Sequence, residues 1–335
     1  MKYQINKIRS YQADLIVTLD QKDLDYYLNE ARKHLANNLK IKGFRPGKAP
    51  LEITKDKLDK EEVLNTAFNF AFKQSFGDIL IKEKIDLIDA GKFEVKENSP
   101  VQMTYSVSLT VFPEFELAGY KNIRVKKNEV FISEEEIDKT IEFIRNSKKQ
   151  NGTLPELTDE FAKSLGQFRD LKQLKESVGE GLKEEKEIKE SQRIQAFVLD
   201  KITETTKIEA PPSLIGQQLD QMILNLDADL HRDGMELGLF LAKINKTQDE
   251  LRNEWRPKAE LLVKKTLIVK KISVIEGIKI DSEEIKLRMS QFFQNFSTPN
   301  EVQKNVDLQK LAGQIEQILL NQKVLSFLEK EAIQN

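Results

Sequence analysis

The chain has 335 residues, of which 53 are Lys or Arg and 55 are Asp or Glu, so no excess of charge draws it as a whole onto nucleic acid or a membrane. It contains no cysteine, which excludes disulfides, thiol nucleophiles and cysteine-ligated metals, and two histidines leave little for imidazole chemistry. Charged residues make up 32% of the chain, and no apolar run approaches the ~18 residues of a membrane span. These features predict a soluble, helix-rich cytoplasmic protein of two or three domains.

The first hundred or so residues predict a compact α+β unit. Residues 13–20 alternate apolar and polar side chains, as a half-buried strand does. Residues 24–39 and 63–80 then show the apolar spacing of two amphipathic helices. Alternation returns at 93–95 and more clearly at 103–111. The order strand, helix, loop, helix, strand, strand predicts a helical hairpin carried by a small sheet.

The chain beyond this unit predicts a connector followed by helices. Residues 114–127 are mixed in character and are expected to be extended. Ser133 with Glu136 forms a capping-box pattern at the start of a short helix. In the long helix that follows, the glycines at 179–181 predict a weak point. Pro257 predicts a kink or a fresh helix start.

The later helices each combine one apolar stripe with a long charged face. Helices of this kind pack in a bundle or stand as extended arms, and the pattern does not choose between the two. The composition and breaks predict three parts: an α+β domain at 1–113, a linker with a short helix at 114–150, and a helical domain at 151–335.

Motifs of enzymatic chemistry are absent from the sequence. It has no phosphate-binding glycine loop, no dinucleotide fingerprint, no nucleophile elbow and no zinc-protease motif. The acidic cluster at 134–136 alternates with lysines and predicts solvated helix surface rather than a metal site. His34 has no second ligand at helical spacing and predicts a surface histidine, and Trp255 predicts core packing. No catalytic residue, metal or cofactor is predicted.

The stretch "KGFRPGKAP" at 42–50 lies between the two predicted helices of the hairpin. Its two glycines and two prolines exclude a helix or a central strand. Residues 31–60 contain nine Lys or Arg against three acidic residues, a local net charge of +6 in a chain whose total is −2. A basic tip with one aromatic side chain can neutralise phosphates and pack on a partner. An ordinary hairpin turn with incidental lysines is the alternative.

Residues 43–50, "GFRPGKAP", resemble the ribosome-docking signature G-F-R-x-G-K-x-P of the trigger factor family, the ribosome-associated bacterial chaperones. Three further segments are similar to the family: "YSVSLTVFPEFEL" to the last strand of its N-terminal domain, "LPELTDEFAKSLG" to the start of its C-terminal domain, and "EGIKIDSEEI" to a later helix junction. The resemblance covers nearly the whole chain. It implies an α+β ribosome-binding domain followed by an all-α, multi-helix chaperone domain with arm-like extensions.

The resemblance also implies a docking site beside the polypeptide exit tunnel of the large ribosomal subunit, where the loop touches a ribosomal protein and ribosomal RNA. The residues at the docking positions are Gly43, Phe44, Arg45, Pro46, Gly47, Lys48 and Pro50. Pro46 departs from the family pattern, since many members have a basic residue there. The change removes one charge and one backbone donor from the predicted contact.

The family usually carries a peptidyl-prolyl isomerase domain between the linker and the helical region. In this chain the linker helix is followed by three residues, 151–153, and then by the segment that resembles the C-terminal domain. Three residues cannot hold a domain of ~50 residues or more, so the isomerase domain is predicted to be absent and the chain is predicted not to be an enzyme.

The predicted function is ATP-independent holding of nascent or unfolded chains, with docking at the ribosome. The candidate client-binding residues are Met222, Met289, Phe292, Phe293 and Phe296, each with ordinary core packing as the alternative. A ribosome-independent holdase or scaffold is the second hypothesis, and a prolyl isomerase is the third. Dimerisation away from the ribosome is left open.

Overall fold

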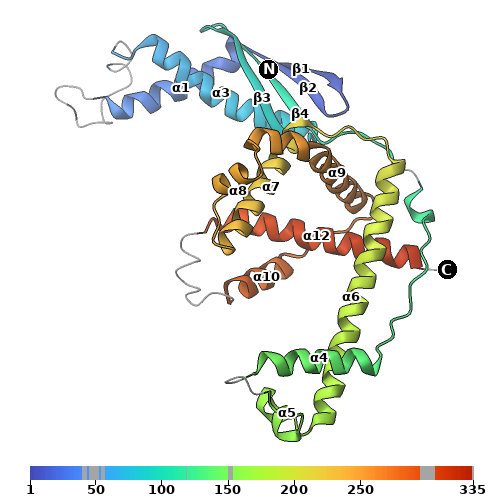
Figure 1. Ribbon diagram of the computed structural model, residues 1–335. Coiled ribbons are helices and arrows are strands. Elements are labelled where there is room, and N and C mark those ends of the chain that lie inside the picture. Colours follow the sequence, from blue (N-terminus) through green and yellow to red (C-terminus); the bar gives the residue numbers. More distant parts are fainter. Residues whose placement is uncertain are drawn as a thin grey trace. The chain divides into compact units, whose positions relative to one another are not determined.

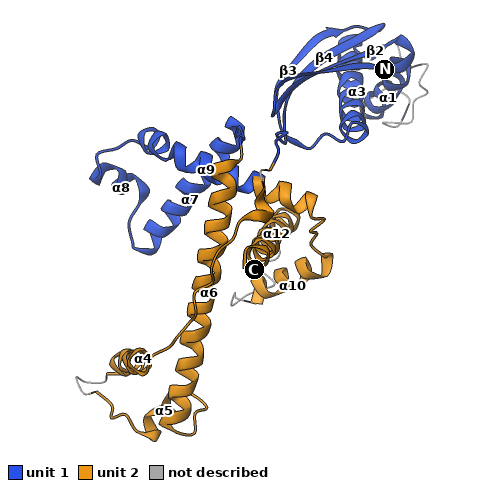
Figure 2. Cartoon of the chain, turned by 90° about the vertical axis from the view of Figure 1, so that its right-hand side faces the viewer, with its two compact units in different colours: residues 1–116, 207–267 blue, residues 117–206, 268–335 orange. Residues whose placement is uncertain are grey.

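The structure is a computed structural model that describes residues 1–39, 44, 53, 57–117, 119–149, 154–294 and 306–333. The chain divides into two compact units, coloured separately in Figure 2. Unit 1 comprises residues 1–116 and 207–267, and unit 2 comprises residues 117–206 and 268–335. The sheet and its helical hairpin belong to unit 1, whereas the connector and the longest helix belong to unit 2. The two units are defined by their internal contacts, and the domain boundaries expected from the sequence stay predictions.

The N-terminal part of unit 1 is a four-stranded antiparallel sheet packed against two helices (Figure 1). Its strands, in the spatial order β1-β2-β4-β3, are β1 (Lys2–Arg9), β2 (Gln12–Asp20), β4 (Gln102–Val111) and β3 (Leu87–Asn98). The helices are α1 (Gln21–Asn38) and α3 (Lys60–Lys82). The α+β class predicted for this region is confirmed.

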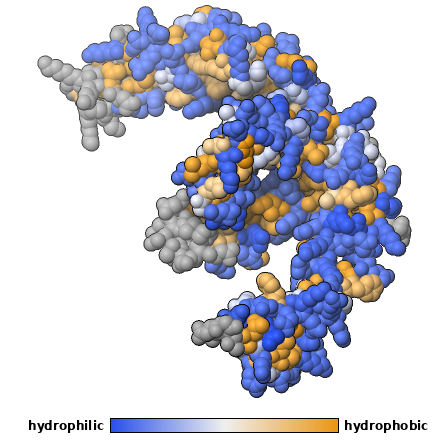
Figure 3. Space-filling model, in the orientation of Figure 1, coloured by the Kyte–Doolittle hydropathy of each residue, from blue (hydrophilic) through white to orange (hydrophobic). Residues whose placement is uncertain are grey.

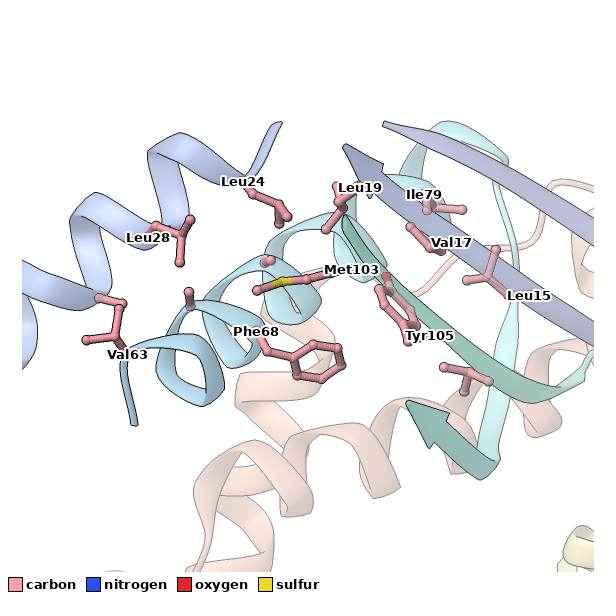
Figure 4. Packing of buried hydrophobic residues seen from close by; sticks show 14 of the residues in the cluster. Leu15, Val17, Leu19, Leu24, Leu28, Val63, Phe68, Ile79, Met103 and Tyr105 are labelled. Atoms are coloured by element: carbon pink, nitrogen blue, oxygen red, sulfur yellow. The ribbon is translucent and has the colours of Figure 1, made fainter. Parts of the chain in front are cut away.

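The core of this part lies between the sheet and the hairpin (Figure 4). Alternate residues of β2 and β4 are buried, as the period of two predicts. Figure 4 shows Val63 and Phe68 of α3 in the same buried cluster as Met103 and Tyr105 of β4. The Tyr105 hydroxyl shares a hydrogen bond of 2.7 Å with the Ser75 hydroxyl, and burial raises the pKa of Tyr105 to about 12.

The edge strand β1 was not predicted from the sequence. Most of its side chains are exposed or half-buried, with Tyr3 and Ile5 packed against the core from one side. An edge strand of this kind carries many polar residues, so its alternation is weak. Its pairing with β2, from Lys2 opposite Thr18 to Arg9 opposite Gln12, is what makes it a strand.

The helices of unit 1 beyond the sheet are α7 (Pro212–Arg232), α8 (Leu237–Lys243) and the larger part of α9 (Gln248–Ile275). Gly234, with φ of +74°, follows α7, and the Met235 N–H donates back to the Leu230 carbonyl. Of the two alternatives predicted at Pro257, a kink or a fresh helix start, the fresh start is wrong, because α9 is continuous through it. Pro257 and Asn253 are both exposed, so water can reach the carbonyl group that proline leaves unpaired.

Unit 2 contains the remaining helices. They are the short 3₁₀ helix η1 (Tyr120–Asn122), α4 (Glu134–Ser147), α5 (Asp159–Leu165), α6 (Leu171–Thr205), α10 (Ser282–Gln294) and α12 (Leu308–Ile333). The capping box at the start of α4 is confirmed, since Ser133 and Glu136 each accept from the other's backbone N–H. The all-helical character predicted for the second half of the chain is also confirmed.

The glycines of α6 do not interrupt it, so the weak point predicted at 179–181 is not a break. A Cβ atom at Gly179 would lie 3.2 Å from Ile137 Cδ1 of α4, whereas one at Gly181 would meet nothing within 4 Å. The first glycine therefore permits close packing of α4 on α6, and the second has no neighbour that requires it.

The connecting segment, defined as residues 119–133, is extended after η1 and is hydrogen-bonded to α6 and α12. Its Asn128 N–H donates to Glu190 Oε1 of α6 at 2.7 Å, and the Arg193 guanidinium of α6 donates to the Lys126 carbonyl at 3.1 Å. Val125 N–H donates to the Ala332 carbonyl at the end of α12, at 3.1 Å. The segment, predicted to be an extended connector over 114–127, thus pairs with side chains and a helix end rather than with a strand.

Candidate functional site

The helical hairpin of α1 and α3 presents the predicted docking loop. α1 begins directly after β2, and Ile79 near the C-terminal end of α3 is buried in the sheet core. The C-terminal end of α1 and the N-terminal end of α3 therefore lie away from the sheet (Figure 1). At those ends the Leu39 N–H donates to the Ala36 carbonyl, and the Asp59 carboxylate caps α3 by accepting from the Glu62 N–H at 2.9 Å. Of the residues that connect these two caps, the structure describes 44, 53, 57 and 58.

Phe44 is the predicted docking residue that the structure describes. Its side chain is 42% exposed, so part of the ring is accessible to a partner. Ile53, on the same connection, is also 42% exposed. The other docking residues lie outside the described residues: Gly43, Arg45, Pro46, Gly47, Lys48 and Pro50.

The described residues of 31–60 on either side of the loop, at the end of α1 and the start of α3, carry more positive than negative charge. Lys33 is paired with Glu30, and the Asp59 carboxylate is used as a cap. Within the described part of the chain, no ion pair involves Arg32, Lys57 or Lys60. At these three positions, ion pairs with described residues therefore do not cancel the charge predicted from composition.

The predicted client-binding residues separate into different environments. Phe293 of α10 is buried with Leu311 and Ile315 of α12, and Met289 is half-buried against the same cluster. Phe292 is 38% exposed, and Met222 of α7 is half-buried. Phe296 lies outside the described residues. Two neighbouring phenylalanines thus differ: Phe293 is buried in the cluster with α12, whereas Phe292 stays partly exposed.

Sequence reasoning missed most of the exposed apolar side chains of the helical region. They are large, at least 40% exposed and spread over several helices and the connecting segment: Phe131, Phe143, Ile188, Phe197, Leu224, Leu239, Leu261, Val274, Ile275, Leu287, Leu308 and Ile318. Figure 3 shows apolar surface in small areas separated by hydrophilic residues. Helical spacing identifies an apolar stripe, but it does not tell whether another helix covers that stripe.

One described hollow in this region is lined by apolar residues of two helices. This α10–α12 slot has a volume of about 200 Å³ and is lined by Phe292, Ile315 and Ile318, with Arg288 and Gln291 at its polar side. α10 and α12 lie side by side through the cluster around Phe293 (Figures 1 and 2). The slot is therefore built within unit 2.

The titratable groups with the largest shifts hold the connecting segment. Hydrogen bonds from the Arg193 side chain and then from the Asn128 N–H lower the pKa of Glu190 to about 2. Lys186 and the Ser133 N–H lower the pKa of Glu136 in the same way, also to about 2. These carboxylates accept structural hydrogen bonds, so their shifts do not indicate acid–base catalysis.

The described residues hold no group of three or more His, Asp or Glu side chains placed to bind a metal ion. No helix among them combines the length and apolar character of a membrane span.

An α+β unit with an exposed hairpin end, followed by charged helices with dispersed apolar side chains, has the features of a molecular chaperone that binds other polypeptides. Family models support a specific assignment. The model "Bacterial trigger factor protein (TF)" matches residues 1–144, and its C-terminal counterpart matches residues 170–330. The chain belongs to the trigger factor family, and the family makes it a chaperone of protein folding.

Individual relatives agree with this assignment. A trigger factor of Halothermothrix orenii is 22% identical, with 98% of each chain covered, and one of Clostridioides difficile is 25% identical, covering 94% of this chain and 96% of the relative. A solved structure, "Promiscuous Substrate Recognition in Folding and Assembly Activities of the Trigger Factor Chaperone", is similar with a TM-score of 0.56 and 19% identity. It covers 99% of this chain and 100% of that chain. The structural likeness supports the fold.

The relatives contain residues that this chain lacks. The alignment with the Halothermothrix orenii protein spans 424 positions, at least 89 more than the 335 residues of this chain. The two family models leave residues 145–169 unmatched. A difference of this size exceeds the ~50 residues of a small domain. It agrees with the absence of an internal domain between α4 and α6.

Proposed function

We propose that this protein is an ATP-independent chaperone that holds nascent or unfolded chains and docks at the polypeptide exit of the large ribosomal subunit. The dispersed exposed apolar side chains of the helical region are the observation that carries the holding function. Each offers weak, non-directional burial, and several contacts along one unfolded chain add up through avidity. The surrounding charged residues keep such a surface from associating with itself.

The proposed docking site is the hairpin tip, residues 43–50. Phe44 packs against a ribosomal protein, and Arg45 and Lys48 neutralise phosphates of the adjacent RNA. The exposed ring of Phe44 and the loop-base cations Arg32, Lys57 and Lys60, which form no ion pair with a described residue, support this assignment. The proposal includes a cytoplasmic location and the domain boundaries 1–113, 114–150 and 151–335.

Docking is tested by cosedimentation with ribosomes. The variant Phe44→Ala, Arg45→Ala, Lys48→Ala is expected to lose binding while its far-UV helical signal is unchanged. A matched control removes one exposed aromatic and two exposed lysines elsewhere on the hairpin: Tyr26→Ala, Lys22→Ala, Lys73→Ala. It should pellet with ribosomes like the wild type. Undiminished binding of the loop variant would favour the ribosome-independent holdase.

Holding is tested by the aggregation of a chemically denatured client after dilution. The protein without nucleotide should suppress light scattering in proportion to its concentration. A proline-peptide assay addresses the alternative enzymatic function, and no acceleration of X-Pro isomerisation is expected. A clear acceleration would contradict the proposed absence of an isomerase domain.

A further inference from the structure

The α10–α12 slot has the dimensions of a site for one side chain. Its volume of about 200 Å³ is below the ~300–1,000 Å³ of small-molecule pockets. Phe292 and Ile318 are exposed at its rim, and Ile315 is buried at its base. One aliphatic or aromatic side chain of a bound peptide would bury these three residues further.

The charges of α10 are paired, with one exception. Glu283 pairs with Lys286 at 2.7 Å, and Glu284 pairs with Lys323 of α12 at 2.6 Å. Arg288 donates to the uncharged Gln291 side chain at 3.2 Å, and it takes part in no ion pair with any described residue. The slot is thus lined by apolar side chains and a single cation for which the described residues supply no counter-ion.

We infer that the slot selects peptide segments in which an apolar side chain is followed or preceded, within one or two residues, by a carboxylate. The apolar side chain fills the slot, and the carboxylate binds the Arg288 guanidinium, which is suited to forked hydrogen bonds. One or two residues of extended chain span ~3.5 to 7 Å, the reach of an arginine that lines the same hollow. The inference rests on the proposed holding function and names the sequence preference of one holding site.

The preference is measured by fluorescence anisotropy with three labelled 12-residue peptides. Each carries one Phe in a Gly/Ser background, followed by Asp, Asn or Lys. The Phe-Asp peptide is expected to bind roughly two- to fivefold more tightly than Phe-Asn, the range of an exposed ion pair, and Phe-Lys more weakly. The difference should shrink as salt rises, because exposed charges are screened.

Two variants of α10 separate Arg288 from general charge. Arg288→Gln should make the Phe-Asp and Phe-Asn affinities equal. Lys286→Gln removes the same charge from the same helix and should keep the preference, because Lys286 is already paired. Ile318→Ser, at the rim, should weaken binding of all three peptides. Equal affinities in the wild type, or a preference that persists in Arg288→Gln, would overturn the inference.

The outcomes distinguish this inference from the proposed function. A wild type that suppresses aggregation but shows no Asp preference retains the holding function and loses the inference. An Arg288-dependent preference without any suppression of aggregation keeps the peptide preference of the slot and contradicts the proposed holding function. If Ile318→Ser instead abolishes self-association in light scattering and leaves peptide binding unchanged, the slot binds a second copy of the chain and the inference is wrong.

Discussion

The N-terminal sheet with its hairpin and the helical region of the chain bury their apolar residues in different ways. The sheet and hairpin share one cluster of 16 buried residues, contributed by strands, two helices and the loop residue Leu58. Two clusters of the helical region, around Phe161 and Phe293, each contain three buried residues. A continuous core fixes the packing of α1 and α3 on the sheet. The helical region buries further side chains, such as Ile194 of α6, Ile268 of α9 and Val324 of α12, but it also leaves apolar side chains exposed and available to bind an unfolded chain.

Removing a side chain from the continuous core should have the largest effect on stability. Leu15→Ala in β2, a fully buried position, is expected to cost about 2–5 kcal/mol of unfolding free energy, since neighbouring residues cannot fill the cavity. Denaturant unfolding of the full chain, followed by circular dichroism, measures the loss.

Leu287→Ala, at a 63% exposed position of α10, provides the matched comparison in the helical region. It should change stability by no more than about 0.5 kcal/mol. Equal losses in the two variants would contradict the difference in burial between Leu15 and Leu287.

The hydrogen bonds of Glu190 make the attachment of the connecting segment depend on pH. Because the folded pKa of Glu190 is lowered from 4.5 to about 2, its stabilising contribution is complete above pH 4.5 and is lost as the pH falls toward 2. Glu190→Gln should therefore unfold at lower denaturant concentration than the wild type at pH 7, and the two midpoints should converge as the pH falls through that range.

Glu185→Gln on the same helix serves as a control. Among the described residues Glu185 pairs with Lys189 alone, at the exposed surface and one turn away, so the midpoint should barely change at pH 7. A shift as large as that of Glu190→Gln would show that the hydrogen bonds to the connecting segment are not the cause.

The smallest expected effects concern the two glycines of α6. Gly181→Ala should stabilise the protein by about 0.5–1 kcal/mol, because alanine favours the helix and nothing lies within 4 Å. Gly179→Ala should gain less, because its Cβ would press on Ile137 at 3.2 Å. Thermal unfolding of the two variants measures the difference. A greater gain at Gly179 would mean that α4 does not pack closely on α6.

The two regions also differ in how far the sequence predicts them. In the sheet and hairpin, both β2 and β4 alternate cleanly because one of their faces is buried, so the sequence pattern predicted both strands. In the helical region the pattern predicted helices but not their environments. Phe292 and Phe293 are adjacent, and only the position of α12 decides which of them is buried. Contacts of this kind depend on residues distant in the sequence, as does the pairing that forms β1.

The candidate docking loop could be predicted from the sequence because its signal is local. Glycine, proline and charge within nine residues predict a constrained basic tip without knowledge of the fold. The α10–α12 slot could not be predicted, because the sequence does not show which cations are paired. Lys286 and Lys323 form ion pairs, whereas Arg288 donates to the uncharged Gln291 side chain.

The hydrogen bonds between the connecting segment and the end of α12 set an order of events during synthesis. Arg124 donates to the Glu331 carbonyl, 207 residues later in the chain, and Val125 donates to that of Ala332. At ~5–20 residues per second, these acceptors are made about 10 to 40 s after their donors. The sheet and hairpin can complete their core during this interval, whereas unit 2 must wait for its last helix.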